Sequence, residues 1–319
     1  MLNCICRFDE QGVFRLADQS KWQSAYLKIS AAEQKERIAA LREKMKSCTL
    51  CPRNCGVDRL QNEKGKCEAP LSAMISSISP HYGEEKVLVG PGGSGTIFFT
   101  HCNLECLFCQ NWTISRGYDG GEEVSAAELA SLMLSLQSRG CSNINLVTPT
   151  PYIYQIVSAL SLAAEGGLTL PVIYNCGGYE SLEALQLLEG FIDIYMPDTK
   201  YGADEIGEIY SGVPGYFSYM GAALQEMQRQ VGDLQLDDRG LATRGLLVRH
   251  LVMPADISGS EAVASFISTK VSPQSAVNVM DQYHPAYRAA DYPRLKRRIT
   301  AEEFRTAREA FRKAGLKIL

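Results

Sequence analysis

Three cysteines in a short stretch of the chain have the residue type and the spacing to hold a metal centre. Cys102, Cys106 and Cys109 follow the pattern Cys-x3-Cys-x2-Cys directly after the apolar run GTIFFT. Three thiolates on one loop can cover one face of a small cluster, but they leave a tetrahedral site open. A zinc site completed by His101 is the alternative, and the adjacency of His101 and Cys102 disfavours it. The spacing therefore predicts a centre that needs a further ligand.

Four more cysteines lie upstream of this loop. Cys48, Cys51, Cys55 and Cys67 are separated by two, three and eleven residues. Four thiolates close a tetrahedral site completely, so the set predicts a second metal site. Zinc and an auxiliary 4Fe–4S cluster both fit the spacing, and a segment without metal is the third alternative.

The composition limits the class of protein that carries these cysteines. A chain of 319 residues with 45% hydrophobic and 21% charged residues suits one large domain with a short appendage and excludes a disordered or fibrous chain. The net charge of -4 gives no overall field that would attract nucleic acid or an anionic membrane. Charged residues early in the chain exclude a signal peptide, and no apolar run reaches the roughly 20 residues of a membrane helix. We expect a cytoplasmic protein whose eleven cysteines serve metal binding rather than disulfides.

The elements that must position the cysteines follow an alternating pattern from residue 94 onward. Short β-branched or aromatic runs alternate with helical patterns, which predicts βα units and a parallel sheet. Two helices begin with capping boxes, at Ser125 with Glu128 and at Thr300 with Glu303. The chain divides into a helical extension (1–47), a Cys4 segment (48–93) and a barrel (94–319). The six predicted strands are 96–100, 143–148, 172–175, 192–196, 246–253 and 276–281.

These motifs resemble the radical SAM superfamily. Its cysteine loop has the same spacing, with an aromatic residue before the last cysteine, which is Phe108 here. Residues 48–319 are more narrowly similar to an uncharacterised subfamily that is itself similar to pyruvate formate-lyase activating enzyme. The likeness rests on the upstream cysteines, HYGEE at 81–85, GTIFF at 95–99, CQN at 109–111 and DQY at 281–283.

The resemblance implies an α/β fold, a partial (β/α)6 barrel, with a 4Fe–4S cluster on Cys102, Cys106 and Cys109. One iron would be open to the amino and carboxylate groups of S-adenosylmethionine (SAM). An electron from a donor such as flavodoxin or ferredoxin would cleave SAM to a 5′-deoxyadenosyl radical, which abstracts hydrogen. The implied function is anaerobic oxidoreduction of a protein or peptide, similar to the activation of a glycyl radical enzyme.

One strand end departs from the superfamily pattern. In most of the superfamily the turn after the second strand is Gly-Gly-Glu, and its acid helps to hold the SAM amino group. Here the turn reads TPTP at 148–151. We expect the hydroxyls of Thr148 and Thr150 to take over as acceptors. A proline turn without any role in SAM binding is the alternative.

Charged residues follow two later strands. Asp198 and Lys200 resemble the Asp-x-Lys of the activating enzymes, where these residues contact SAM, and a surface ion pair is the alternative. Arg249 could pair with a carboxylate such as that of methionine. His250 points to the other face of its strand, so we expect a structural role for it.

Two further functions compete with this one. The same radical could modify a small metabolite or RNA. The electrostatic support for RNA is the basic run 294–298 and the basic face of the last helix, with Arg305, Arg308 and Arg312. Such runs are usually solvated faces, so nucleic acid is disfavoured. The chain could also be a non-catalytic iron–sulfur or zinc module, which the intact three-cysteine loop argues against.

Overall fold

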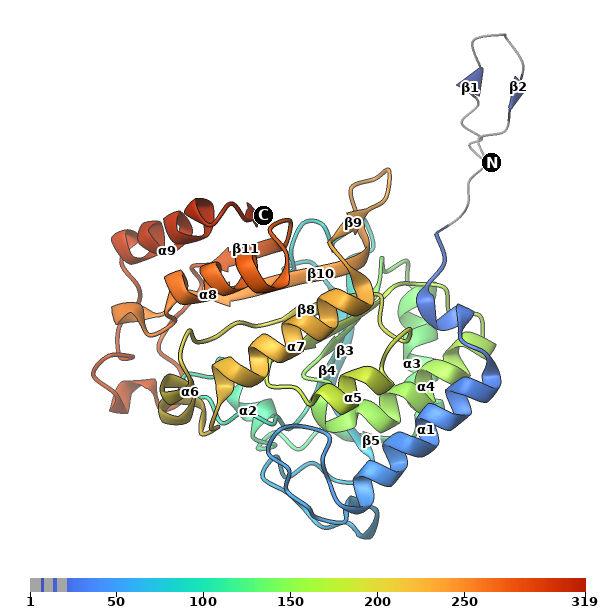
Figure 1. The fold of residues 1–319 in the computed structure, drawn as a ribbon. Coiled ribbons are helices and arrows are strands. Elements are labelled where there is room, and N and C mark those ends of the chain that lie inside the picture. The colour runs from blue at the N-terminus through green and yellow to red at the C-terminus, as the bar shows by residue number, and fades with distance from the viewer. Residues whose placement is uncertain (1–6, 9–13, 16–21) are drawn as a thin grey trace.

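The computed structural model describes residues 7–8, 14–15 and 22–319. Its main sheet has ten strands, and seven of them run parallel: six in chain order that are each followed by a helix, and a two-residue strand at one edge (Figure 1). All six predicted strands are confirmed, with ends shifted by a few residues. They are β4 (Ser94–Phe99), β6 (Ile144–Val147), β7 (Val172–Cys176), β8 (Ile194–Pro197), β10 (Ala242–Leu251) and β11 (Ala276–Met280).

Helices follow each of these six strands, so the fold is the predicted (β/α)6 arrangement. Both predicted capping boxes are formed, at the starts of α3 and α9. The α-helices after the strands are α2 (Trp112–Ser115), α3 (Ala126–Ser138), α4 (Ile153–Glu165), α5 (Leu182–Leu187), α6 (Asp204–Ser211), α7 (Tyr216–Val231), α8 (Ser260–Phe266) and α9 (Ala301–Lys313). Shorter turns of 3-10 or π helix are η1 (Ala25–Lys28), η2 (Arg59–Gln61), η3 (Thr150–Tyr152), η4 (Pro254–Asp256), η5 (Ile267–Val271) and η6 (Ala289–Asp291).

The sheet does not close into a full barrel, because other strands pair with the two outer strands of these six. On one side β3 (Ala73–His81) is antiparallel to β4 and to β5 (Glu122–Val124). On the other side β12 (Lys317–Ile318) pairs with β11, and β9 (Gln235–Leu236) joins β10. The barrel is therefore partial, as predicted.

The two faces of the sheet are buried in different ways. Alternate residues such as Tyr174, Tyr195 and Leu246 belong to the large core that the helices cover. The opposite set belongs to a separate cluster around Leu88. Val87 and Leu88 also accept hydrogen bonds from the Ala242 amide and the Asn143 side chain. The loop after β3 therefore fills the inner face of the sheet below its carboxyl edge.

In the described part of residues 1–47, the longest element is a helix that packs on the core. α1 (Ala31–Lys46) is capped by Ser30, and Leu41 and Met45 on it are fully buried. Cys4 and Cys6 lie outside the described residues. β1 (Arg7–Phe8) and β2 (Phe14–Arg15) pair with each other. Within the described ranges, no helix combines the length and the apolar character that a membrane span requires.

His250 on β10 has the structural role that its position predicts. Its Nδ1 lies 2.7 Å from the Thr199 carbonyl oxygen and its Nε2 lies 2.9 Å from Ser260 Oγ. The carbonyl can only accept, so Nδ1 carries the proton and Nε2 accepts from the hydroxyl. The ring also packs 4.9 Å from that of Phe311. Burial lowers the pKa of His250 to about 4.

This lowered pKa predicts a specific loss of stability in acid. The unfolded chain takes up the His250 proton near pH 6.5, while the folded chain resists it down to about pH 4. The free energy of unfolding should therefore fall by up to about 3 kcal/mol as the pH drops through this window. In His250→Gln this part of the pH dependence should vanish. Urea unfolding of both proteins between pH 7 and pH 4 tests it, and equal pH dependences would contradict it.

Candidate active site

The three-cysteine loop crosses the carboxyl edge of the parallel sheet. It leaves β4 through His101, whose φ of +65° is unusual for a residue with a side chain. Hydrogen bonds then tie the loop to the segments that follow β7, β8 and β11. They join Asn103 Nδ2 to Tyr179 O, the Glu105 amide to Ser211 O, and the Arg288 amide to Leu107 O. The loop is thus held at the edge where parallel barrels place their chemistry.

The structure brings the three predicted thiols together. Burial, together with the nearby thiols of Cys106 and Cys109, raises the pKa of Cys102 to about 12. Each sulfur also has a hydrogen-bonding group beside it. These pairs are Cys102 Sγ with the Leu104 amide at 3.4 Å, Cys106 Sγ with Ser211 Oγ at 2.9 Å, and Cys109 Sγ with Ser115 Oγ at 3.3 Å.

These neighbours fit a bound metal centre. The amide and the two hydroxyls can all donate to sulfur, so they would stabilise thiolates rather than thiols. Among the residues that the structure describes, no three His, Cys, Asp or Glu side chains are arranged to hold a metal ion as they stand.

Phe108 fills the space beneath the loop. Its ring centre lies 6.4 Å from that of Tyr201 and 6.0 Å from that of Tyr283. The Tyr201 hydroxyl also lies 2.6 Å from the hydroxyl of Ser211, the partner of Cys106. The aromatic residue before the last cysteine thus anchors the loop on two tyrosines.

Three predicted charged residues meet at the ends of β8 and β10. Lys200 pairs with Asp198, and Asp198 lies 4.0 Å from Arg249. Burial disfavours the Lys200 ammonium, but the Asp198 carboxylate outweighs this and the pKa of Lys200 is raised. The Lys200 charge in turn opposes the rise that burial causes in the pKa of Cys106. The side chains of Asp198 and Lys200 stay 25% and 13% exposed, so a ligand at the edge can reach them.

Arg249 has two partners that the sequence analysis assigned no role. Its guanidinium lies 3.5 Å from a Glu84 oxygen and 3.4 Å from a Glu85 oxygen. Asn278 on β11 also donates to Glu85 at 2.7 Å. The two glutamates lie near the start of the loop that fills the inner face. Arg249 is therefore already paired with protein carboxylates. Nothing near Arg249 in the sequence signals this contact.

The two threonines in the turn after β6 have different surroundings. Thr148 lies directly at the strand end with a φ of +61°. The hydroxyl of Thr150 donates to Glu180 at 2.9 Å, and Tyr174 donates to the same carboxylate at 3.0 Å. Burial raises the pKa of Glu180 to about 7, and these two hydroxyls counteract the rise. The Thr150 hydroxyl is therefore committed to a buried acid that the sequence analysis missed.

Tyr216 on α7 holds the ends of β7 and β8 in register. Its hydroxyl lies 2.8 Å from Gly177 O and 3.0 Å from Asp198 O, and it accepts the Lys200 amide at 3.0 Å. Gly178 allows this closeness, because a Cβ there would stand 2.3 Å from Asp198 O. One buried hydroxyl thus positions both residues of the Asp198–Lys200 pair.

The four upstream cysteines lie close enough to one another for their thiols to interact. Burial raises the pKa of Cys51 and of Cys67, and the nearby thiol of Cys48 contributes to both increases. The thiol of Cys55 also contributes to the raised pKa of Cys67. A Cβ on Gly65 would stand 2.9 Å from Cys55 Sγ, so only glycine leaves room for the sulfur. The Lys66 amide donates to the same sulfur at 3.4 Å. These features fit a site in which Cys55 carries a thiolate.

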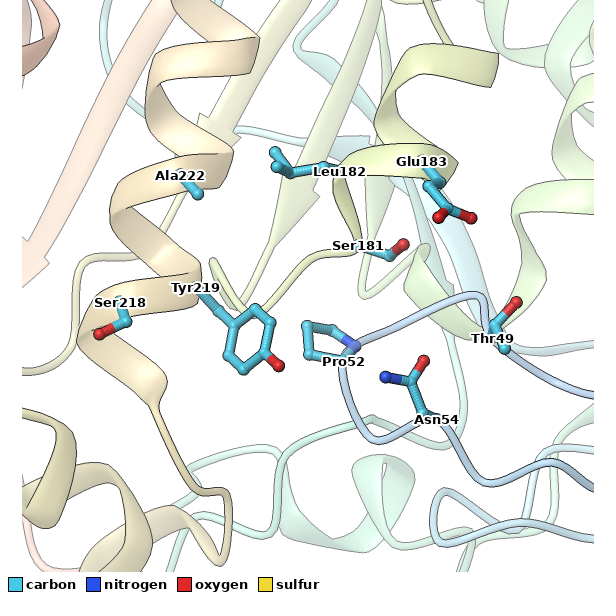
Figure 2. A pocket seen from close by; sticks show the side chains of 9 residues that line it. All are labelled: Thr49, Pro52, Asn54, Ser181, Leu182, Glu183, Ser218, Tyr219 and Ala222. Carbon is cyan, nitrogen blue, oxygen red and sulfur yellow. The ribbon is translucent and has the colours of Figure 1, made fainter.

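A cavity of about 440 Å³ opens between the upstream cysteine segment and helices α5 and α7 (Figure 2). The ring of Tyr219 faces Pro52 across it. Glu183 is the charged residue in its lining, and it forms an ion pair with Lys44. None of the nine lining residues is a predicted site residue. The cavity is therefore separate from the three-cysteine loop.

The fold and site define a class, a partial (β/α)6 barrel with a cysteine loop after its first parallel strand. No known family profile matches the chain. The uncharacterized protein MJ0674 of Methanocaldococcus jannaschii is 34% identical over 303 residues, which cover 92% of this chain and 82% of that protein. The chain belongs to the same family as MJ0674.

Solved structures with a similar trace include two enzymes. A radical SAM methyltransferase from Sphaerobacter thermophilus has a TM-score of 0.49 and 14% identity, over 93% of this chain and 94% of that one. Methylornithine synthase (PylB) has a TM-score of 0.47 and 16% identity, over 68% of this chain and 60% of that one.

The role of Tyr216 can be tested by removing its hydroxyl. Tyr216→Phe should lower the free energy of unfolding by about 1–3 kcal/mol, because it leaves buried backbone groups unpaired. Tyr219→Phe, on the same helix but 42% exposed, should change it by less than about 0.5 kcal/mol. Urea unfolding measures both. Equal effects of the two variants would contradict the assigned role.

Proposed function

We propose that the chain is a radical SAM enzyme that holds a 4Fe–4S cluster on Cys102, Cys106 and Cys109 and binds SAM beside it. The observation that carries the proposal is the grouping of these thiols at the carboxyl edge, each with a donor at its sulfur, next to the Asp198–Lys200 pair. When bound, the cluster would supply the electron that cleaves SAM and so generates the radical that takes hydrogen from the substrate.

The residues of the chain have distinct tasks in this proposal. The three cysteines hold the iron, and the hydroxyls of Ser211 and Ser115 donate to two of the sulfurs. Asp198 would accept from the SAM amino group and Lys200 would donate to its carboxylate. Arg249 would interact with the SAM carboxylate less directly, because its guanidinium is already paired with Glu84 and Glu85. Thr148 would offer a further hydroxyl at the edge.

We further propose a protein or peptide substrate, oxidised in the manner of glycyl-radical-enzyme activation. The loop around Leu88 fills the inner face of the sheet below the site. A substrate must therefore approach the carboxyl edge from outside, which suits an extended segment of a larger molecule. Flavodoxin or ferredoxin would supply the electrons, and the reaction would be anaerobic.

Cys48, Cys51, Cys55 and Cys67 would hold the second metal. Two observations at Cys55 support this site: Gly65 leaves room for the sulfur, and the Lys66 amide donates a hydrogen bond to it. Both zinc and an auxiliary 4Fe–4S cluster suit four thiolates.

The cluster assignment predicts SAM cleavage that depends on the loop. Anaerobically reconstituted protein, reduced with dithionite and given SAM, should form 5′-deoxyadenosine. Cys106→Ala should reduce its formation to the level of protein without iron. Cys141→Ala should retain it, since Cys141 is a buried cysteine outside both sets. Formation at the normal rate by Cys106→Ala would refute the assignment.

The charged pair predicts a loss of SAM affinity. Asp198→Asn and Lys200→Met should each weaken binding by about 1–3 kcal/mol, the worth of one hydrogen bond to a charged group. This is about a 5- to 150-fold rise in Kd. Asp238→Asn, an exposed aspartate in the turn before β10, should leave the affinity unchanged. Calorimetric titration measures all three, and unchanged affinity in both site variants would give the pair a structural role.

A further inference from the structure

Arg59 is a buried cation without a carboxylate partner among the described residues. Its side chain is 1% exposed. One terminal nitrogen donates to Pro151 O at 2.6 Å and the other donates to Pro70 O at 2.7 Å, while Nε has no partner. Two carbonyl oxygens carry no net charge, and burying an unpaired charge is costly. A guanidinium in this position requires an anion nearby.

The four upstream thiols are the groups that can supply this anion. Arg59 lies in the loop between Cys55 and Cys67, and its hydrogen bond to the Pro70 carbonyl oxygen places the guanidinium against the backbone that directly follows Cys67. Cysteines bind metal as thiolates. Four thiolates outweigh the charge of either zinc or an oxidised 4Fe–4S core, so the bound centre is anionic with both metals.

We propose that Arg59 is the buried counter-charge of an anionic four-thiolate metal centre and links that centre to the three-cysteine loop. The inference rests on the second metal site proposed above and is independent of the radical chemistry. Arg59 is a positioning residue, because it touches neither the substrate nor the reacting atoms.

The link runs through a short series of contacts. The Arg59 guanidinium carbon lies 6.0 Å from the centre of the Tyr152 ring, in the turn whose Pro151 it also binds. The Tyr152 hydroxyl lies 3.1 Å from His101 Nδ1. His101 directly precedes Cys102 and has the positive φ noted above. Strained backbone of this kind persists only where surrounding contacts hold it.

A second arginine of the same segment holds the other side of Cys102. Arg53 Nε donates to Asn103 O at 2.5 Å, and its Nη2 lies 3.3 Å from Glu105. The upstream segment thus fixes the residues on both sides of Cys102. The segment can hold them only when its own buried charge is balanced.

The test measures the metal content of the full chain and the rate at which a chelator removes the metal. Replacing Cys102, Cys106 and Cys109 by Ala leaves the upstream set as the proposed site, and this triple variant is the parent. Anaerobically purified parent should contain about one zinc or about four irons per chain. Elemental analysis decides between the two metals. A parent with neither metal would overturn the inference, while 5′-deoxyadenosine formation by the unmodified chain tests the radical chemistry separately.

Arg59→Met in this parent should release the metal to a chelator about 10- to 100-fold faster, as the loss of a group that supports a metal site does. Arg59→Lys keeps the charge and should release it at a rate close to that of the parent. Arg42→Met, an exposed arginine on α1, is the matched control and should match the parent. Release from Arg59→Met at the parent rate would overturn the inference.

If Arg59→Met does not fold, Arg59→Gln is measured in its place, with circular dichroism confirming its fold. Faster release from Arg59→Gln together with retention in Arg59→Lys supports the counter-charge. Equally fast release from Arg59→Gln and Arg59→Lys would show that the carbonyl contacts matter and the charge does not, which overturns it.

Discussion

The structure depends on one constraint, the attachment of the three-cysteine loop across the ends of several parallel strands. A loop that carries three thiols cannot hold its shape by local contacts alone, because its backbone needs hydrogen-bond partners. Those partners come from the segments after β7, β8 and β11. The positions of Cys102, Cys106 and Cys109 therefore follow from the order of the whole sheet.

Charge balance at the carboxyl edge sets the second requirement. Asp198, Glu84 and Glu85 surround Arg249, and Asp198 also holds Lys200. These groups are mostly buried, so each charge needs its neighbours. The glutamates come from the loop that fills the inner face of the sheet. One segment thus closes the interior from below and orients the charged groups above it.

Much of this architecture could be predicted from the sequence, and the failures have a physical pattern. The six parallel strands are buried runs with strong β propensity, and the two capping boxes are local signals. β3 was missed because its sequence AMISSISPH has little strand character, and its pairing with β4 supplies the order. The roles of Glu84, Glu85 and Arg59 depend on partners far along the chain, and sequence spacing does not reveal such partners.

The two cysteine sets share one frame, and this bears on how the site is assembled. The upstream segment contributes Arg53 to the backbone of the three-cysteine loop, and Arg59 to the turn after β6. The barrel contributes Lys200, whose charge acts on Cys106. Cations from different parts of the chain thus lie around the two cysteine sets, where burial disfavours the thiolate form. We therefore expect the upstream segment, the turn after β6 and the three-cysteine loop to become ordered together. Each of them lacks a partner for its charge or its backbone until the others are in place.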